Sequence, residues 1–330
     1  MKRILVTGAC GSIGKALVLK LLEGGNKVCA FDNNEDGLFH LMKEHYSFAL
    51  NLKIFVGDVR DIERLEQAMD GVEEVYHCAA LKHVELSEYN PFEALKTNVN
   101  GTNNVINAAI KKSVKKVLVT SSDKAVNPSS TMGTTKLLAE KLTISANNYS
   151  GSKDIKFGCV RFGNVWNTNG SVGPIFKNQI LSGEDITVTD KGMTRFFTSK
   201  DDAINLCIDA CSSLIGGEIF ISDMGATSIG LIADEFQSYN PDVNVIEIGP
   251  KPGEKLFEEL FTDVESARTF RYSDMYVILP DCLDKESTKY NQLQSFYNDS
   301  NPIGTALISD SEIAKKVDAK KLVSGLMNES

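Results

Sequence analysis

The sequence predicts an α/β fold, a doubly wound parallel sheet with a smaller C-terminal domain, and three observations support this prediction. Short apolar runs alternate with amphipathic helical patterns through the first half of the chain. A glycine-rich turn joins the first run to the first helical pattern, and acidic residues follow two of the later runs closely. Buried strands that alternate with helices indicate a parallel sheet that is covered by helices on both faces.

The expected strands follow one another along the first half of the chain. Apolar runs predict them at residues 3–6, 27–31, 52–56, 72–78, 116–120 and 156–161. Helical patterns lie between most of these runs, and the first one extends to Leu22. A parallel sheet needs such crossovers, because each strand must return to the same edge before the next one starts.

Composition excludes several classes of function. The 330 residues carry a net charge of −9, so we expect no nucleic-acid partner and no anionic membrane surface. No apolar run approaches the ~18 residues of a membrane span, and the run that ends before Thr7 is too short for a signal peptide. We therefore expect a cytoplasmic protein.

Cysteine and histidine usage indicates neither disulfides nor a metal site. The seven cysteines are scattered without a CxxC pair, and the four histidines lack metal-ligand spacing. We expect reduced thiols in the core and no bound metal.

The glycine cluster is the first chemical signal. It runs Gly8-Ala9-Cys10-Gly11-Ser12-Ile13-Gly14, directly after the first predicted strand. Gly8 permits the tight turn, Gly11 lets the backbone approach a pyrophosphate at the helix N-terminus, and Gly14 allows close packing of the helix on the sheet. Because the cluster follows a strand and opens a helix, it predicts a dinucleotide site rather than an ordinary turn.

Asp32 indicates which dinucleotide is bound. It closes the second predicted strand, where a carboxylate accepts hydrogen bonds from the adenosine ribose and repels a 2′-phosphate. Asn33 follows, and no arginine is near in the sequence. The pattern therefore favours NAD over NADP.

The spacing of the three glycines resembles the extended short-chain dehydrogenase/reductase family, whose nucleotide domain is a Rossmann sheet. The resemblance continues at Asp58-Val59, which implies an adenine-binding turn, and at Ala79-Ala80, which implies the segment beneath the nicotinamide. Asn98 stands where this family keeps a structural asparagine, and our prediction also counts it among the substrate-site residues. Lys136 matches the lysine that binds the nicotinamide ribose.

One branch of that family fits best, the polysaccharide-biosynthesis group of sugar-nucleotide 4,6-dehydratases, which supplies bacillosamine, pseudaminic acid and legionaminic acid pathways. The segments that carry this resemblance are residues 79–85, 122–128, 161–165, 170–176, 193–197 and 251–260. The branch implies UDP- or GDP-N-acetylglucosamine as substrate. It also implies oxidation at C4, loss of water across C5–C6 and return of the hydride to C6. The resemblance does not distinguish uracil from guanine.

The resemblance also implies the domain plan. Residues 1–165 are expected to form the NAD-binding domain, with a return segment near 198–221, and residues 166–330 are expected to form mainly the substrate-binding domain. A homodimer or higher homo-oligomer, formed through the helix after Met132, is expected on the same ground. Residues beyond 270 match nothing that we recognise.

The reaction requires an acid and a base at the carboxyl end of the fifth predicted strand. Asp123 and Lys124 lie there, and the resemblance implies Asp123 as the acid and Lys124 as the base. Burial raises the pKa of an aspartate and lowers that of a lysine, so a neutral pair is expected to be accessible. Met132 replaces the tyrosine that most of the family uses, as in configuration-retaining dehydratases. Ser122 is therefore the expected acceptor of the C4 hydroxyl proton.

Tyr149 and Lys153 repeat the Tyr-x-x-x-Lys spacing but lie near the end of a helical pattern, so we assign them to structure. Arg195 resembles a diphosphate or ribose contact. The other residues that the resemblance places at the substrate are Lys82, His83, Asn98, Asn164, Ser171, Val172, Lys251 and Glu254.

Two other functions stay open. A 4-epimerase of the same substrates shares the fold and the cofactor but needs no acid and base for water loss, so Asp123 and Lys124 argue against it. A non-catalytic NAD-sensing protein would treat Met132 as the mark of a dead site, and the retained Lys136 argues against that.

Overall fold

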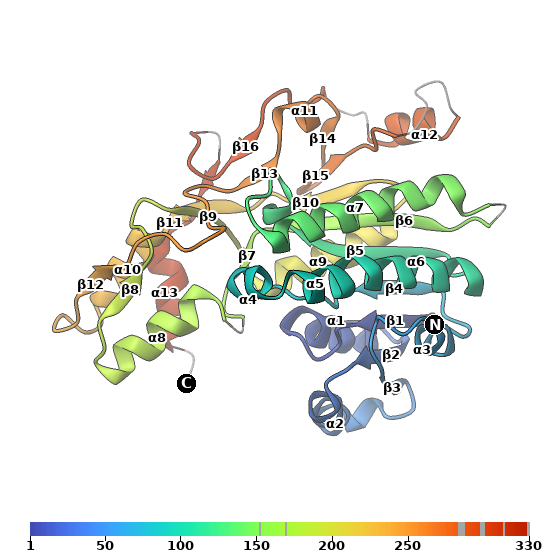
Figure 1. The fold of residues 1–330 in the computed structure, drawn as a ribbon, viewed down its shortest axis with the longest axis horizontal. Coiled ribbons are helices and arrows are strands. Elements are labelled where there is room, and N and C mark those ends of the chain that lie inside the picture. The colour runs from blue at the N-terminus through green and yellow to red at the C-terminus, as the bar shows by residue number, and fades with distance from the viewer. Residues whose placement is uncertain (152, 169, 283–287, 298–300, 313, 329–330) are drawn as a thin grey trace.

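The main sheet confirms the predicted fold class. The computed structural model describes residues 1–151, 153–168, 170–282, 288–297, 301–312 and 314–328. In spatial order, the strands of its main sheet are β14 (Thr269–Tyr272), β15 (Met275–Ile278), β10 (Ile219–Ser222), β6 (Lys156–Phe162), β5 (Lys116–Ser122), β4 (Glu74–His77), β1 (Arg3–Thr7), β2 (Lys27–Asp32) and β3 (Leu52–Val56) (Figure 1). The strands from β10 to β3 run parallel, whereas β14 and β15 are antiparallel additions at one edge.

Helices cover both faces of this sheet. One face carries α3 (Ile62–Ala68), α6 (Gly101–Lys112) and α7 (Thr131–Tyr149), and the other carries α1 (Ser12–Glu23), α2 (Glu35–Glu44), α9 (Lys200–Ser213) and α12 (Thr288–Tyr297). Leu5 packs into the first layer, whereas Ile4 and Val6 pack into the second. Because successive side chains of a strand point to opposite faces, a strand buried on both sides reads as a continuous apolar run.

Short helices and turns connect these layers. They are η1 (Tyr46–Phe48), α4 (Val84–Tyr89), α5 (Pro91–Ala94), η2 (Leu95–Asn100) and η3 (Asp123–Ala125). The side chains of Asn34, Asp61 and Ser130 each accept a hydrogen bond from the first turn of the helix that follows. Such caps fix where a helix begins, since its first N–H groups have no partner within the helix.

A smaller region lies beyond the carboxyl ends of the parallel strands (Figure 1). Its sheet contains β17 (Lys315–Lys316), β11 (Gly225–Ser228), β9 (Thr194–Thr198) and β7 (Asn164–Val165), and β12 (Val245–Glu247) pairs with β8 (Ile186–Val188). Its helices are α8 (Val172–Ser182), α10 (Ile229–Gln237) and α13 (Ala319–Asn328), which share an apolar core with Phe176, Phe236 and Val323 at its centre. The pair β13 (Glu259–Phe261) and β16 (Leu307–Ile308) and the short helix α11 (Asp263–Ser266) lie nearby.

The chain enters the main sheet again after the smaller region begins. β10 lies beside β6. Its first three residues fall inside the expected return segment, 198–221, and Ser222 lies one residue beyond it. Residues 269–278 also join the main sheet, although the sequence suggested nothing for most of that stretch. These residues join the sheet because β15 pairs with β10 and buries Val277 in the core. The division into cofactor and substrate domains stays a prediction.

Candidate active site

The glycine turn between β1 and α1 forms a cradle that leaves no room for a side chain at Gly8 or Gly14. Gly8 has φ +67°, and a Cβ there would approach the backbone nitrogen of Ala79 to 2.6 Å. A Cβ on Gly14 would overlap the carbonyl oxygen of Gly8, so α1 packs directly on the turn. A Cβ on Gly11 would meet one protein atom, the Gly8 carbonyl oxygen at 3.3 Å, among the described residues. These contacts fit a loop that brings backbone N–H groups to a diphosphate.

Asp32 and Asp58 lie at the neighbouring ends of β2 and β3. The Asp32 carboxylate accepts hydrogen bonds from the backbone N–H groups of Cys10 (2.9 Å) and Asn34 (3.0 Å), which hold it at the rim of the glycine turn. Asn33 hydrogen-bonds Asp58, and the Arg60 guanidinium beside Asp58 lowers the pKa of that carboxyl group. Together these residues could hold an adenosine ribose, as the sequence predicts.

Arg60 lies beside Asp58 in the structure, although the sequence around Asp32 contains no arginine. Arg60 donates to Asp58 (2.6 Å) and to Glu93 (2.8 Å), so two carboxylates already share its charge. The sequence prediction concerned only the residues that follow Asp32 along the chain, and Arg60 comes from a different segment, the turn after β3. The strand end at Val56 pairs with Asp32, and the turn that follows carries Arg60 toward that end.

Asn98 lies beside the segment that follows β4, which contains Ala79 and Leu81. The Asn98 amide accepts from the Leu81 N–H (2.8 Å) and donates to the Leu81 carbonyl (3.0 Å) and to Thr135 (3.0 Å). Its side chain is 1% exposed, so the structure places Asn98 as a brace between this segment and α7 rather than at a cavity wall. This geometry matches the structural part of its predicted role and not the substrate part.

Ser122, Asp123 and Lys124 form a continuous hydrogen-bonded chain at the carboxyl end of β5. The Ser122 hydroxyl donates to Asp123 Oδ1 (2.7 Å), and Lys124 Nζ donates to the same oxygen (3.0 Å). Lys124 Nζ also donates to Asn164 Oδ1 (3.2 Å) on β7. Asp123 is fully buried, and its second oxygen, Oδ2, has no hydrogen-bond partner among the described residues. The arrangement can pass a proton between a hydroxyl, a carboxylate and an amine.

The charge state of Lys124 differs from the sequence expectation. Burial lowers the pKa of Lys124, but attraction to the carboxylates of Asp123 and Glu258 outweighs it, so the pKa lies above the ordinary lysine value. The expected shift of this lysine toward neutrality is therefore wrong for the structure as it stands. Burial alone would lower the pKa, but the carboxylates of Asp123 and Glu258 lie close to the amine and raise it.

The start of α7 sets the positions of Met132 and Lys136. Met132 is 3% exposed, and its thioether cannot exchange a proton. Lys136 Nζ donates to the carbonyl of Thr120 (2.9 Å) on β5, and burial lowers the pKa of this lysine. A Cβ on Gly133 would overlap the carbonyl oxygen of Lys124, so this glycine lets α7 lie directly against η3. Sequence reasoning missed Gly133, although its place beside Met132 was visible.

A cavity of about 140 Å³ opens next to Lys124. The predicted residues that line it are Lys124, Asn164, Arg195 and Glu254. Arg195 is 6% exposed and donates to the carbonyl groups of Thr194 (2.7 Å) and Lys255 (2.8 Å), so the backbone already holds much of its guanidinium group. Glu258 also lines the cavity, and sequence reasoning did not single it out as a site residue.

The remaining predicted substrate residues lie outside the walls of that cavity. Ser171 precedes Val172 at the start of α8, and its hydroxyl accepts from the Thr168 N–H (3.2 Å). His83 immediately precedes α4, and its ring faces Gly170. Burial lowers the pKa of Lys82, which follows the β4 segment.

Lys251 stands on the surface and forms an exposed ion pair with Glu85 (3.6 Å). Its substrate role stays a prediction, as do those of Ser171, Val172, His83 and Lys82.

Tyr149 is the last residue of α7 and is half-exposed, whereas Met132 lies in the first turn of the same helix. Seventeen residues of helix separate the two, which is about 25 Å along the axis. The placement agrees with the structural assignment of Tyr149.

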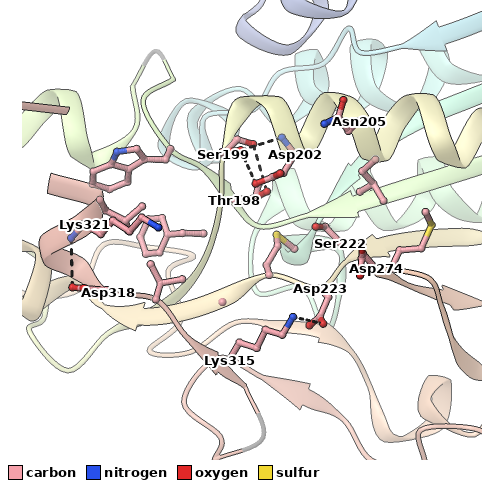
Figure 2. Close-up of a pocket in the computed structure, with 18 of the residues that line it drawn as sticks. Thr198, Ser199, Asp202, Asn205, Ser222, Asp223, Asp274, Lys315, Asp318 and Lys321 are labelled. Carbon is pink, nitrogen blue, oxygen red and sulfur yellow. Dashed lines mark hydrogen bonds and ion pairs between the residues drawn. The ribbon is translucent and has the colours of Figure 1, made fainter. Parts of the chain in front are cut away.

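A larger cavity of about 790 Å³ lies between the start of α9, the end of β10 and α13. Figure 2 shows Lys315 pointing toward Asp223, and Ser199 with Asp202 at the first turn of α9. None of the predicted site residues lines this cavity. Its walls carry charges of both signs, and the geometry assigns it no part in the chemistry above.

The described residues contain no group of three or more histidine, cysteine, aspartate or glutamate side chains that could hold a metal ion. Within the same residues, no helix has the length and apolarity needed to cross a membrane.

Comparison with known proteins gives a consistent family. A family model described as "Polysaccharide biosynthesis protein" matches residues 4–280. An uncharacterized membrane protein of Methanocaldococcus jannaschii is 47% identical, covering 84% of this chain and 86% of the relative. A UDP-N-acetylglucosamine 4,6-dehydratase (inverting) of Campylobacter jejuni is 37% identical over 92% of this chain and 94% of its own length. A protein named UDP-glucose 4-epimerase, from Rickettsia rickettsii, is 38% identical over 88% of this chain and 86% of its own length.

A solved structure extends the similarity to almost the whole chain. The X-ray structure of Pen from Bacillus thuringiensis superposes with a TM-score of 0.89 at 36% identity, covering 99% of this chain and 97% of that one. The similarity therefore includes the stretch beyond residue 270, where the sequence offered no interpretation.

Proposed function

This chain belongs to the polysaccharide biosynthesis family of extended short-chain dehydrogenases/reductases, and from that membership we propose that it is an NAD-dependent 4,6-dehydratase of a nucleotide-activated N-acetylglucosamine. The base of the nucleotide is uracil or guanine. The product is the 4-keto-6-deoxy sugar nucleotide, a precursor for surface glycan or nonulosonic acid synthesis. Met132 resembles the configuration-retaining members at that position, whereas the Campylobacter relative is named an inverting enzyme.

One observation carries this proposal: the hydrogen-bonded chain from Ser122 through Asp123 to Lys124. Loss of water across C5–C6 needs an acid at the C6 oxygen and a base at C5, whereas epimerisation at C4 needs neither. An acid and a base that share one oxygen at a strand end, beside a cavity, meet that need. The name of the Campylobacter relative supports the same reaction.

We infer that the cofactor is NAD, which when bound would supply reversible hydride chemistry. The cradle of Gly8, Gly11 and Gly14 would hold its diphosphate, and Asp32 its adenosine ribose. Lys136, whose Nζ is fixed on the Thr120 carbonyl, would contact the nicotinamide ribose. The rest of the proposed set is Ser12, Ile13, Asn33, Asp58, Val59, Ala79 and Ala80.

The chain's own residues then move protons. Ser122 accepts the C4 hydroxyl proton and passes its own proton to Asp123 along the 2.7 Å hydrogen bond. Asp123 donates that proton to the departing C6 hydroxyl group, so the proton lost at C4 leaves in water. Lys124 removes the C5 proton. Arg195 and Lys251 would face the diphosphate.

Incubation with UDP- and GDP-N-acetylglucosamine, followed by mass spectrometry and NMR, tests the reaction. We expect a product lighter by one water, with a ketone at C4, hydrogen transferred from C4 to C6, and solvent hydrogen at C5. A product of unchanged mass that is epimeric at C4 would instead establish the epimerase that the Rickettsia relatives are named for. No turnover of either substrate would favour an NAD-sensing role.

Asp123→Asn and Lys124→Ala test the residues. Each should lower turnover at least ~100-fold, the usual effect of a lost general acid or base. In Lys124→Ala, C4 oxidation should survive better than water loss, so NADH should accumulate on that variant. Asp123→Asn also removes the acceptor of the Ser122 proton, so it should slow NADH formation as well. Near-normal turnover of both variants would make the pair structural.

We also propose that the protein forms a homo-oligomer through α7 and the adjoining helices. Leu138 on α7, Leu86 and Tyr89 on α4, and Phe92 on α5 are all exposed. Light scattering of the wild type and of Leu138→Glu tests this arrangement, and an unchanged mass in the variant would exclude α7.

A further inference from the structure

Glu258 is a buried carboxyl group at the active-site cavity that the proposed mechanism does not use. Its side chain is 3% exposed and lines the cavity with Lys124 and Arg195. Oε2 has no hydrogen-bond partner among the described residues; its one ion pair there, with Lys255 Nζ at 3.7 Å, is longer than a hydrogen bond. A buried polar atom without a partner is unfavourable, so such an atom often has a functional role.

The backbone holds Glu258 in place from both sides. Its N–H donates to Ser309 Oγ (2.9 Å), and its carbonyl accepts from the Ser309 N–H (2.9 Å). Ser309 is fixed in turn to Thr194 (2.7 Å), the residue before Arg195 on β9. The strand β13, which starts one residue after Glu258, contacts η3 and therefore the Asp123–Lys124 pair.

Charged groups of both signs surround this carboxyl group. Asp123 and Lys124 approach it from η3, Arg195 from β9, and Lys255 from its own segment. Burial raises the pKa of Glu258 above its ordinary value, against the attraction of Lys124. A carboxyl group in this environment binds a proton more readily than an exposed glutamate does.

Lys124 needs such a partner. It is held as an ammonium group by the attraction of Asp123 and Glu258, yet a base must be unprotonated before it can remove the C5 proton. Asp123 is already committed to the acid role, and its Oδ1 accepts from both Ser122 and Lys124.

We propose that Glu258 takes the ammonium proton of Lys124, so that the lysine can act as the base; this inference rests on the proposed dehydratase function. An N–H bond of Lys124 breaks and an O–H bond forms at Glu258 Oε2, while the electron pair stays on nitrogen. Lys124 and Glu258 line the same cavity without a direct hydrogen bond, so the proton crosses through a water molecule or a sugar hydroxyl in the cavity. When the sugar expels water from the cavity, the lower dielectric favours the neutral amine and carboxylic acid over the ion pair.

The pH dependence of turnover distinguishes this role from a structural one. In the wild type, Lys124 and Glu258 share one proton across the neutral range, so turnover should vary little between about pH 6.5 and 8.5. In Glu258→Gln the acceptor is gone, and free amine appears only as the pH rises toward the ordinary lysine range near ~10.4. Turnover should fall at least ~10-fold at pH 7 and recover up to ~10-fold per pH unit.

Three further measurements complete the test. Single-turnover NADH formation should stay close to the wild-type rate in Glu258→Gln, because C4 oxidation does not use the base. Glu258→Asp should keep the flat pH profile, since it retains a carboxyl group. Glu259→Gln is the matched control, because the neighbouring carboxylate bonds Asn127 (2.7 Å) instead of facing the cavity.

The outcomes separate this inference from the proposed function. A flat profile at the wild-type rate in Glu258→Gln would overturn it, and so would an equal loss at every pH, which indicates a structural defect. If the wild type dehydrates neither substrate, the proposed function fails, and NMR titration of ¹³C-carboxyl-labelled ligand-free protein decides about Glu258. Its resonance, identified by its absence in the variant, should titrate above the ordinary glutamate value of about 4.3. Titration at or below that value would exclude a proton acceptor for Lys124.

Discussion

At the residue scale, the proposed mechanism gives the hydroxyl of Ser122 the role that most of the family gives to a tyrosine. Met132 occupies the tyrosine position, is buried, and has no exchangeable proton. Ser122 instead heads the hydrogen-bonded chain that reaches Asp123 and Lys124. A hydroxyl connected to a carboxylate can release its own proton as it accepts another, so it can serve as a relay where a thioether cannot.

We expect Ser122→Ala to slow single-turnover NADH formation at least ~10-fold, because it removes the acceptor of the C4 proton. Met132→Leu should keep the rate within roughly tenfold, since the swap nearly conserves volume. Tyr149→Phe is the control for the second Tyr-x-x-x-Lys sequence, and it should change little at the far end of α7. Loss of NADH formation in Tyr149→Phe alone would show that Tyr149, and not Ser122, belongs to the active site.

The cofactor preference also belongs to single residues. Purified protein should release NAD on denaturation, because Asp32 repels a 2′-phosphate and a recycled hydride carrier has no need to leave. Arg60 should not reverse this preference, since Asp58 and Glu93 hold its guanidinium group. Chromatography of the released nucleotide measures it, and mainly NADP would contradict the role of Asp32. Arg60→Ala, as the control, should leave the nucleotide unchanged.

At the element scale, the contact of α7 with η3 positions the proposed acid and base, Asp123 and Lys124. Ser130 caps the helix, Gly133 lets it approach, and Lys136 ties it to β5. Asn98 joins the same helix to the β4 segment through Thr135. One helix therefore sets the distance between the nicotinamide side of the site and Lys124.

Gly133→Ala should disrupt this contact, because a Cβ would overlap the Lys124 carbonyl oxygen and push α7 away from η3. We expect a loss of about 1–3 kcal/mol in the free energy of unfolding and a large fall in turnover. Gly325→Ala is the matched control, since a Cβ on that glycine of α13 meets no atom within 4 Å among the described residues. It should stabilise the protein by about 0.4–1 kcal/mol in urea unfolding. Equal effects of both variants would contradict the proposed contact.

At the scale of the whole molecule, one buried arginine joins segments that are far apart in the sequence. Arg161 on β6 donates to both oxygens of Glu140 (2.8 and 2.7 Å) on α7 and to Glu265 (2.8 Å) on α11. It is 1% exposed, as is Glu140. These ion pairs hold the segment after Glu258 against the main sheet, so they contribute to the position of the cavity wall.

Arg161→Leu should lower the free energy of unfolding by about 3–5 kcal/mol, because it leaves a buried carboxylate without its partner. Lys15→Ala is the control, since its ion pair with Glu44 is exposed at both ends and should contribute little to stability. Urea unfolding of the two variants compares them. Similar midpoints would show that the buried pairs do not hold the two segments together.

The sequence by itself determined the local elements and named the candidate catalytic groups. Each of the six predicted strands is present, although β4 is shorter than its apolar run, and Ser122, Asp123 and Lys124 lie where the end of the fifth strand placed them. These features depend on residues within one strand or one turn, so periodicity and spacing are enough to predict them.

Only the tertiary structure decided which distant groups meet. It placed Glu258 at the same cavity as Lys124, although more than a hundred residues separate them in the sequence. It also placed Arg60 beside Asp58 and added β14 and β15 to the main sheet. It also raised the pKa of a lysine that burial alone would lower. Such contacts, and the pKa values that they set, depend on the packing of the whole chain. The pattern of neighbouring residues in the sequence does not contain that information.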